Sequence, residues 1–119
     1  MATWNLSNTR HHVLICNGGS CMRGGAEAVT QAIREEIRTC GADGLIHTTR
    51  TRCNGRCDDA CVVIVYPEGV WYQGMTPESG RQMVQEHLLG GSPVLERAVY
   101  TYGGTGLAPT GSGREGVSK

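Results

Sequence analysis

The order of apolar and polar positions predicts alternating strands and helices along the first part of the chain. Residues 12–16 form a short apolar run that is typical of a buried strand, and residues 17–20 then predict a turn. From Gly25 onward, apolar residues recur at steps of three and four, which predicts an amphipathic helix that Gly41 ends. The apolar stripe of this helix consists of Ala26, Val29, Ile33, Ile37 and Cys40.

The pattern continues with two strands, a hairpin and a second helix. Residues 45–51 contain Leu, Ile and three Thr and predict a strand, and the β-branched run at 61–66 predicts a strand at the sheet centre. Residues 67–72 turn back on this strand as a hairpin. Thr76 is a good N-cap and Pro77 is favoured in a first helical turn, so a helix begins there. The inner face of that helix is formed by Met83, Val84, His87 and Leu88.

This order of elements predicts the fold class. A βαβ unit followed by an antiparallel hairpin and a covering helix is an α/β arrangement of thioredoxin-like type, with a mixed β-sheet flanked by helices. We expect residues 1–11 to be an irregular N-terminal lead-in and residues 12–101 to be the folded domain, with a short helical or extended piece at 94–100. Residues 102–119 are expected to be a flexible tail, because six glycines fall within the last 17 residues.

Length and charge narrow the classes of protein. A chain of 119 residues fits one domain. Lys plus Arg and Asp plus Glu both total 11, so the net charge is zero, which argues against a partner such as nucleic acid or an anionic membrane surface. No apolar run approaches the roughly 18 residues that a membrane span needs. The N-terminus lacks the apolar core of a secretory signal, so a cytoplasmic location is the default expectation.

That expectation changes the interpretation of the six cysteines, because clustered cysteines in a reducing compartment are more often metal ligands than disulfides. Cys16 and Cys21 form a C-x4-C pair, and Cys53 and Cys57 form a C-x3-C pair after 31 intervening residues. Each pair lies in a predicted loop. In a thioredoxin-like sheet the two loops can lie side by side, which places four thiolates around one point, as a two-iron cluster needs. Nearby cations that offset the charge of such a cluster are Arg23, Arg50, Arg52 and Arg56.

The spacing by itself leaves other interpretations open. Structural zinc uses the same thiolates, so spacing does not decide between zinc and iron–sulfur. A thioredoxin-like dithiol is disfavoured because no C-x-x-C occurs, and disulfides require an exported protein. The four cysteines are also poor candidates for plain core residues, since they lie in glycine-rich loops. Of the other two, Cys40 is interpreted as core packing on its helix stripe, and Cys61 as a structural residue close enough to compete as a ligand.

At this point the residues resemble a known family. The segments at 16–25, 53–57 and 62–72 are similar to the thioredoxin-like [2Fe–2S] ferredoxins, and the same cysteine pairs mark the related small subunits of complex I and of some hydrogenases. The resemblance implies a [2Fe–2S] cluster, one-electron transfer and a tendency to form homodimers; some short relatives are associated with cobalamin biosynthesis. Carried over by position, the cluster ligands are Cys16, Cys21, Cys53 and Cys57.

The predicted function is therefore that of a small electron carrier, which accepts an electron from a reductase and passes it to a partner oxidoreductase. No Ser/His/Asp set, paired carboxylates or phosphate-binding loop indicates substrate turnover, so we do not expect an enzyme. The alternative is a subunit or redox sensor whose four-cysteine site, iron–sulfur or zinc, is structural. A weaker alternative is a thiol oxidoreductase that uses Cys57 and Cys61.

Other polar and aromatic residues receive structural interpretations from the sequence. His11 and His12 are interpreted as a solvated pair at a strand start, and His87 as a helix residue with no special role. Trp71 and Tyr72 are expected in core or dimer packing. The residues expected to cap or solvate the second cysteine loop are Asp58 and Asp59.

Overall fold

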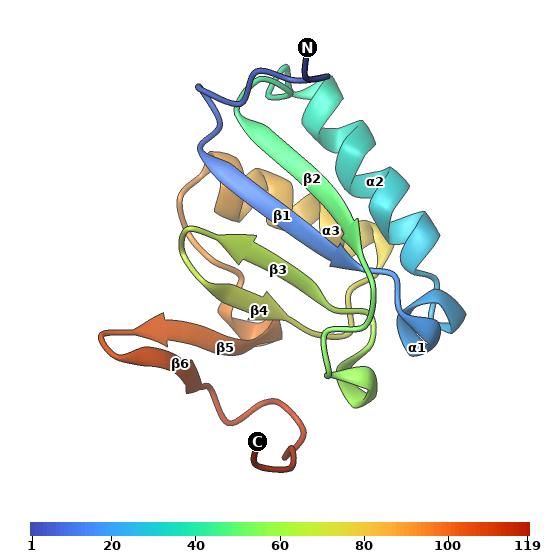
Figure 1. Cartoon of the computed structure of the whole chain (residues 1–119), viewed down its shortest axis with the longest axis vertical. Helices are drawn as coiled ribbons and strands as arrows, with labels where there is room; N and C mark the ends of the chain where they lie inside the picture. The colour runs from blue at the N-terminus through green and yellow to red at the C-terminus, as the bar shows by residue number, and fades with distance from the viewer.

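Parallel pairing of the first two strands organises the fold. The computed structural model describes residues 1–119 and pairs β1 (His11–Cys16) with β2 (Ile46–Thr51) in register along their whole length, ending at Cys16 beside Thr51. Between them the chain passes through α1 (Gly19–Arg23) and α2 (Ala26–Thr39). Because the two strands run in the same direction, the segments that follow both of them begin at the same end of the sheet (Figure 1).

The remaining strands extend the sheet with antiparallel pairings, in the order β2-β1-β3-β4-β5-β6. The mixed sheet with flanking helices confirms the predicted fold class. The further strands are β3 (Val63–Tyr66), β4 (Val70–Tyr72), β5 (Ala98–Gly103) and β6 (Gly106–Pro109). The further helical segments are the 3₁₀ turn η1 (Cys57–Asp59), α3 (Pro77–Met83), the π-helical η2 (Val84–Leu89) and the 3₁₀ turn η3 (Leu95–Arg97).

Helices α2 and α3 pack against each other, and α3 crosses behind the sheet in Figure 1. The contact is close at Gly80 of α3, where a Cβ atom would lie 3.0 Å from Cγ1 of Ile33 on α2. The predicted stripe of α2 is confirmed at Val29, Ile33 and Ile37, each no more than 1 % exposed. The predicted N-terminus of α3 is confirmed as well, because Thr76 caps it and its side chain accepts a hydrogen bond from the N–H of Ser79. None of the helices combines the length and the apolar character that a membrane crossing requires.

The prediction that Cys40 packs in the core is wrong. The α-helix ends at Thr39, and Gly41 turns the chain with a φ of 67°, so the helical spacing no longer applies at Cys40. Cys40 is exposed, with its sulfur 3.6 Å from a carboxylate oxygen of Glu36 and 3.4 Å from the amide nitrogen of Gln85. A cysteine on an apolar stripe was therefore misassigned because it lies one residue beyond the last helical turn.

The part of the chain expected to be a flexible tail begins with regular structure. Strand β6 pairs with β5 from Tyr100 beside Pro109 to Gly103 beside Gly106. The apolar pattern did not predict this strand, because β6 is an edge strand and three of its four residues are exposed. Its main-chain hydrogen bonds, which no side-chain pattern reveals, define the pairing. The proposed domain limits, 12–101 and 102–119, stay a prediction.

One face of the sheet has no helical layer. Residues opposite one another in register share a face, and this face carries Leu14, Ile64, Trp71 and Tyr100 in one row across four strands. Trp71 and Tyr100 meet edge to face with ring centroids 6.2 Å apart. Tyr66, also on this face, is 37 % exposed. The sheet thus presents an apolar and aromatic face on the side opposite Val13 and Ile15.

A buried polar network links η2 to strand β4 and to the turn between β3 and β4. His87 is 1 % exposed, and its Nδ1 and Nε2 lie 2.7 Å from the Tyr72 hydroxyl and from Oε2 of Glu68. Burial lowers the pKa of His87, although Glu68 opposes the shift, so the ring is neutral and has one donor and one acceptor. Nε2–H donates to the Glu68 carboxylate, Nδ1 accepts from Tyr72, and the Tyr72 oxygen accepts from the N–H of Val94.

This network corrects two interpretations from the sequence. His87 joins β4 to the segment before β5 rather than only filling a helix face. Nor is His11 a solvated residue, because its Nδ1 lies 2.9 Å from Oε2 of Glu68. The second helix also continues as a π-helical segment from Val84, a change of hydrogen-bond pattern that residue types at helical spacing do not predict.

Replacing Tyr72 by Phe should destabilise the protein, because it leaves the buried N–H of Val94 and Nδ1 of His87 without their partner. We expect a loss of about 1–3 kcal/mol in the free energy of unfolding. Tyr102→Phe is the matched control, since the Tyr102 side chain is 58 % exposed and its hydroxyl makes no hydrogen bond. Thermal unfolding followed by circular dichroism measures both; equal melting temperatures for the two variants would contradict the assignment.

Candidate metal centre

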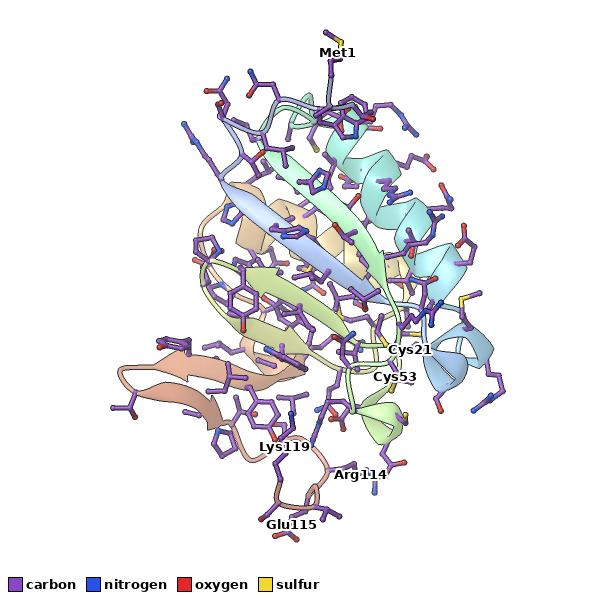
Figure 2. The ribbon with its side chains drawn as sticks, viewed as in Figure 1. Met1, Cys21, Cys53, Arg114, Glu115 and Lys119 are labelled. Carbon is purple, nitrogen blue, oxygen red and sulfur yellow. The ribbon has the colours of Figure 1, made fainter.

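The two predicted cysteine loops meet at one end of the parallel strand pair. Cys16 is the last residue of β1 and Cys21 lies in α1, whereas Cys53 follows β2 and Cys57 begins η1. The structure brings these four side chains to the lining of one small cavity, together with Gly18, Ser20 and Arg56. In Figure 2, Cys21 and Cys53 lie close together at the end of the sheet where β1 and β2 finish.

Close contact between main-chain segments holds the loops together. A Cβ atom at Gly18 would lie 2.8 Å from Cα of Cys53, so only glycine permits this approach. Beside it, the N–H of Asn17 donates to the carbonyl of Thr51 at 2.8 Å and continues the β1–β2 ladder into the loops. The Asn54 side chain donates to the Thr51 hydroxyl and to the Arg52 carbonyl, at 2.6 and 3.1 Å. The ligand loops are therefore positioned by hydrogen bonds at the strand ends.

The four thiols differ in their exposure. Cys16 and Cys21 are 3 % and 2 % exposed and belong to the hydrophobic core. Cys53 and Cys57 are exposed, and their sulfur atoms lie 3.4 Å apart. The cavity is thus closed by the core on one side and reaches the surface on the other.

The thiol of Cys16 donates to the carbonyl of Arg52 at 3.6 Å, and groups of Gly18 and Asn54 also act on its sulfur. Burial alone raises the pKa of this thiol, but hydrogen bonds from the main chain of Gly18 and from Asn54 outweigh burial, and the pKa is lowered. The N–H of Gly55 donates to the sulfur of Cys53 at 3.3 Å. These donors stabilise thiolate, the form in which cysteine binds metal.

The neighbouring thiols show the opposite shift. Burial raises the pKa of Cys21 to about 12, and the charge of Cys16 adds to the effect. The pKa of Cys57 is also raised, first by its hydrogen bond with Cys53. Several thiolates in one cavity repel each other unless a cationic centre lies between them. The donor set fits a metal–sulfur group that carries positive charge on its metals.

The arrangement of the thiols also bears on which metal group fits. The four thiols line one cavity, and four thiolates around one point are the donor set of a [2Fe–2S] cluster and also of a structural zinc ion. The donor set therefore fits a [2Fe–2S] cluster and a four-cysteine zinc site alike.

The predicted cations have different positions. Arg56 lines the cavity itself, whereas Arg50 forms a 2.7 Å ion pair with Glu27 on α2. The interpretation of Asp59 as a solvated loop residue is wrong: its side chain is 1 % exposed and pairs with Arg56 at 2.7 Å. The charge of Asp59 at a loop position gave no signal of burial, because the segment that covers it, at Arg114, is remote in the sequence.

Cys61 lies near the site without lining the cavity. It is 3 % exposed, and its thiol donates to the main-chain carbonyl of Cys21 at 3.3 Å. A Cβ atom at Gly24 would lie 3.3 Å from its sulfur, so the thiol packs beneath the first cysteine loop. Burial raises its pKa, which disfavours the nucleophilic thiolate that an oxidoreductase would need.

Comparison with known proteins agrees with this geometry. Residues 5–88 match the family model of the thioredoxin-like [2Fe-2S] ferredoxins. The chain belongs to this family. Its members carry a [2Fe–2S] cluster, so the zinc alternative that the spacing left open is set aside.

Individual relatives support the family assignment. One relative is a protein of Priestia megaterium that is named as a proposed 2Fe-2S ferredoxin. It is 50 % identical over all of this chain and 94 % of its own length. A 2Fe-2S ferredoxin of Clostridium pasteurianum is 30 % identical over 73 % of this chain and 93 % of its own. The solved structure of a thioredoxin-like [2Fe-2S] ferredoxin from Aquifex aeolicus has a TM-score of 0.76 and 32 % identity, covering 86 % of this chain and 97 % of that one.

Replacing Gly18 by Ala should separate the two cysteine loops, because the added methyl group would overlap the main chain of Cys53. We expect less iron and sulfide per purified chain and a loss of about 1–3 kcal/mol in stability, the usual cost of overpacking. Gly44→Ala is the control, since nothing lies within 4 Å of a Cβ atom there. Iron and sulfide analysis with thermal unfolding tests both variants; a full complement in Gly18→Ala would show that the close approach is not needed.

Proposed function

We propose that the protein is a small electron carrier whose cluster is held by Cys16, Cys21, Cys53 and Cys57. The observation that carries this proposal is the single cavity to which two loops from the parallel strand pair bring all four thiols. A [2Fe–2S] cluster supplies reversible one-electron chemistry when it is bound. Family membership supports an electron-transfer role rather than substrate turnover.

The chain's own residues supply binding, insulation and access. Cys16 and Cys21 anchor the inner side, where the hydrophobic core excludes water. Cys53 and Cys57 face the surface, so a redox partner approaches from their side. Met22 on α1 follows Cys21 directly, is 47 % exposed and offers a soft, adaptable contact to that partner.

Two kinds of redox partner follow from this role: a reductase that supplies the electron and an oxidoreductase that accepts it. Enzymes of cobalamin biosynthesis are the acceptor class to examine first, because the family resemblance connects short members with that pathway. A cytoplasmic location is part of the same proposal. Zero net charge means that partners recognise local features around the cysteine loops rather than an overall field.

We also infer that the protein forms a homodimer through the open face of the sheet. This face, defined by Leu14, Ile64, Tyr66, Trp71 and Tyr100, has no helical layer and carries partly exposed aromatic side chains. A second copy of the chain meets no overall charge repulsion at this face, because the net charge is zero. The family resemblance favours the same assembly.

Purified protein should be brown and contain two irons and two sulfides per chain, the composition of the cluster. Serine in place of Cys53 or Cys57 should abolish or strongly alter the visible and EPR spectra, because an alkoxide donor replaces a thiolate. Cys40→Ser is the control and should leave both spectra unchanged, since Cys40 is exposed beyond the end of α2 and does not line the cavity.

The same samples separate the carrier from the alternatives. Repeated reduction and oxidation with retention of the cluster supports an electron carrier. Loss of the cluster on oxidation would favour a redox sensor, and colourless protein with stoichiometric zinc and no sulfide would overturn the proposed function.

A charged residue on the open face should disrupt the dimer. Tyr66→Arg places a guanidinium on the central strand β3 of that face, and two copies would bury like charges against each other. We expect mass from light scattering to fall from about two chains to one. Leu89→Arg, at a position 43 % exposed on η2, is the control and should stay dimeric; a monomeric wild-type protein would contradict the inference.

A further inference from the structure

The Arg56 side chain is held in place by several contacts at once. It lies between Cys53 and Cys57 in the sequence and lines the same cavity, yet its side chain is only 13 % exposed. Its Nε and Nη2 atoms each lie 2.7 Å from Oδ2 of Asp59. Its guanidinium also lies over the ring of Tyr100, 5.2 Å from the centroid.

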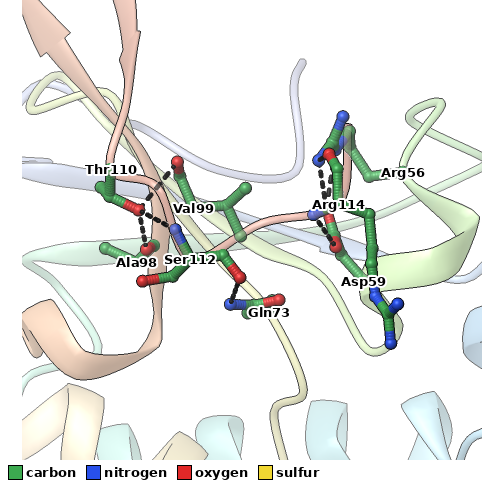
Figure 3. A network of polar contacts seen from close by, with 8 residues as sticks. All are labelled: Arg56, Asp59, Gln73, Ala98, Val99, Thr110, Ser112 and Arg114. Atoms are coloured by element: carbon green, nitrogen blue, oxygen red, sulfur yellow. Dashed lines mark hydrogen bonds and ion pairs between the residues drawn. The ribbon is translucent and has the colours of Figure 1, made fainter. Parts of the chain in front are cut away.

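The main chain near the C-terminus completes this arrangement. The N–H of Arg114 donates to Oδ1 of Asp59 at 3.3 Å, and the carbonyl of Arg114 accepts from Nη2 of Arg56 at 2.5 Å (Figure 3). One residue of the C-terminal segment therefore contacts both partners of the ion pair. Because the contacts are made by the Arg114 main chain, they depend on the path of the segment rather than on its side chains.

That path is defined by contacts with the sheet. The N–H of Thr110 donates to the carbonyl of Val99 at 2.9 Å. The Thr110 hydroxyl donates to the carbonyl of Ala98 at 2.6 Å, and the Gln73 side chain donates to the carbonyl of Ser112 at 2.9 Å (Figure 3). Gly113 lies so close to β5 that a Cβ atom would come within 2.1 Å of Cγ1 of Val99. We call residues 110–116 the C-terminal strap.

The strap lies outside residues 5–88, the part that matches the family model, whereas the P. megaterium relative matches the whole chain. We propose that the strap fixes Arg56 beside the cavity, which makes Arg56 a positioning residue for the loop that carries Cys53 and Cys57. This inference rests on the proposed function, which assigns those cysteines as ligands.

The physical argument is that the strap shields an otherwise weak interaction. An ion pair between residues three apart on a short turn contributes little when water surrounds it. Under the strap, Asp59 is buried and accepts hydrogen bonds on both carboxylate oxygens, from Arg56 and from Arg114. The loop is then held in one geometry, and a positive charge stays at a fixed place in the cavity lining.

Removal of the strap tests the positioning role. A chain that ends at Pro109 should lose its cluster about tenfold faster in the presence of an iron chelator, as absorbance reports, because one charge-assisted network is gone. Amide hydrogen exchange over residues 53–59 should rise in the same variant. The control is a chain that ends at Gly116, which keeps the strap and removes only three exposed residues.

Point substitutions avoid the loss of a whole segment. Gly113→Ala should reproduce the truncation, since its methyl group overlaps Val99, whereas Gly104→Ala, with open space around it, should behave as wild type. Arg56→Gln and Arg56→Lys should both speed cluster loss, because neither keeps the planar fork that reaches Asp59 and Arg114. Arg56→Gln should also move the reduction potential to a more negative value, whereas Arg56→Lys, which keeps the charge, should not.

The outcomes separate this inference from the proposed function. Faster exchange at 53–59 together with faster cluster loss supports the strap. Unchanged exchange in the truncated chain overturns it, and faster exchange without faster cluster loss overturns the positioning role. Wild-type protein without iron and sulfide would overturn the proposed function and the positioning role together, and hydrogen exchange would still report whether the strap holds the loop.

Discussion

The structure depends on the approach of two loops at the end of one parallel strand pair. β1 and β2 run in register to Cys16 and Thr51, so the chain leaves both strands at the same edge. The absence of a side chain at Gly18 then lets the first loop lie against the main chain of Cys53. Two cysteine pairs separated by 31 residues in the sequence come to line one cavity for this reason. An antiparallel pairing of β1 and β2 would place the pairs at opposite ends of the sheet.

The fold meets the electrostatic demands of that cavity with main-chain groups. Four thiols with one side in a hydrophobic core are costly to ionise, as the raised pKa of Cys21 shows. Donors from Gly18, Asn54 and Gly55 offset part of this cost. These donors belong to short loops that are anchored at the strand ends. The main chain therefore offsets this cost without dedicated cationic side chains. The arginine that does line the cavity is matched by its own buried carboxylate, Asp59.

The two faces of the sheet are covered to different extents. Helices α2 and α3 cover the face of Val13 and Ile15, and the His87 network closes the end of that layer farthest from the cysteines. The other face has only side chains from the strands, with the C-terminal hairpin extending it at one edge. The strap then returns from β6 to the cysteine loops along Val99 (Figure 3). Segments inside and outside the family-model match thus meet at Arg56.

The sequence by itself determined what local patterns encode: the strands around the cysteines, the inward stripe of α2, the Thr76 cap and the spacing of the two cysteine pairs. It did not show that Cys21 lies in a short helix, α1, rather than in a loop. The cysteine spacing alone did not determine which metal group the thiols suit, and family membership decides it. Only the tertiary structure decided that Cys40 is exposed, that Asp59 and His87 are buried in polar networks, and that β6 pairs with β5. The reason is physical. Periodicity reports one helix or strand at a time, whereas these features arise from partners such as Arg114, Glu68 and the edge of β5, which are remote in the sequence or make contact through the main chain.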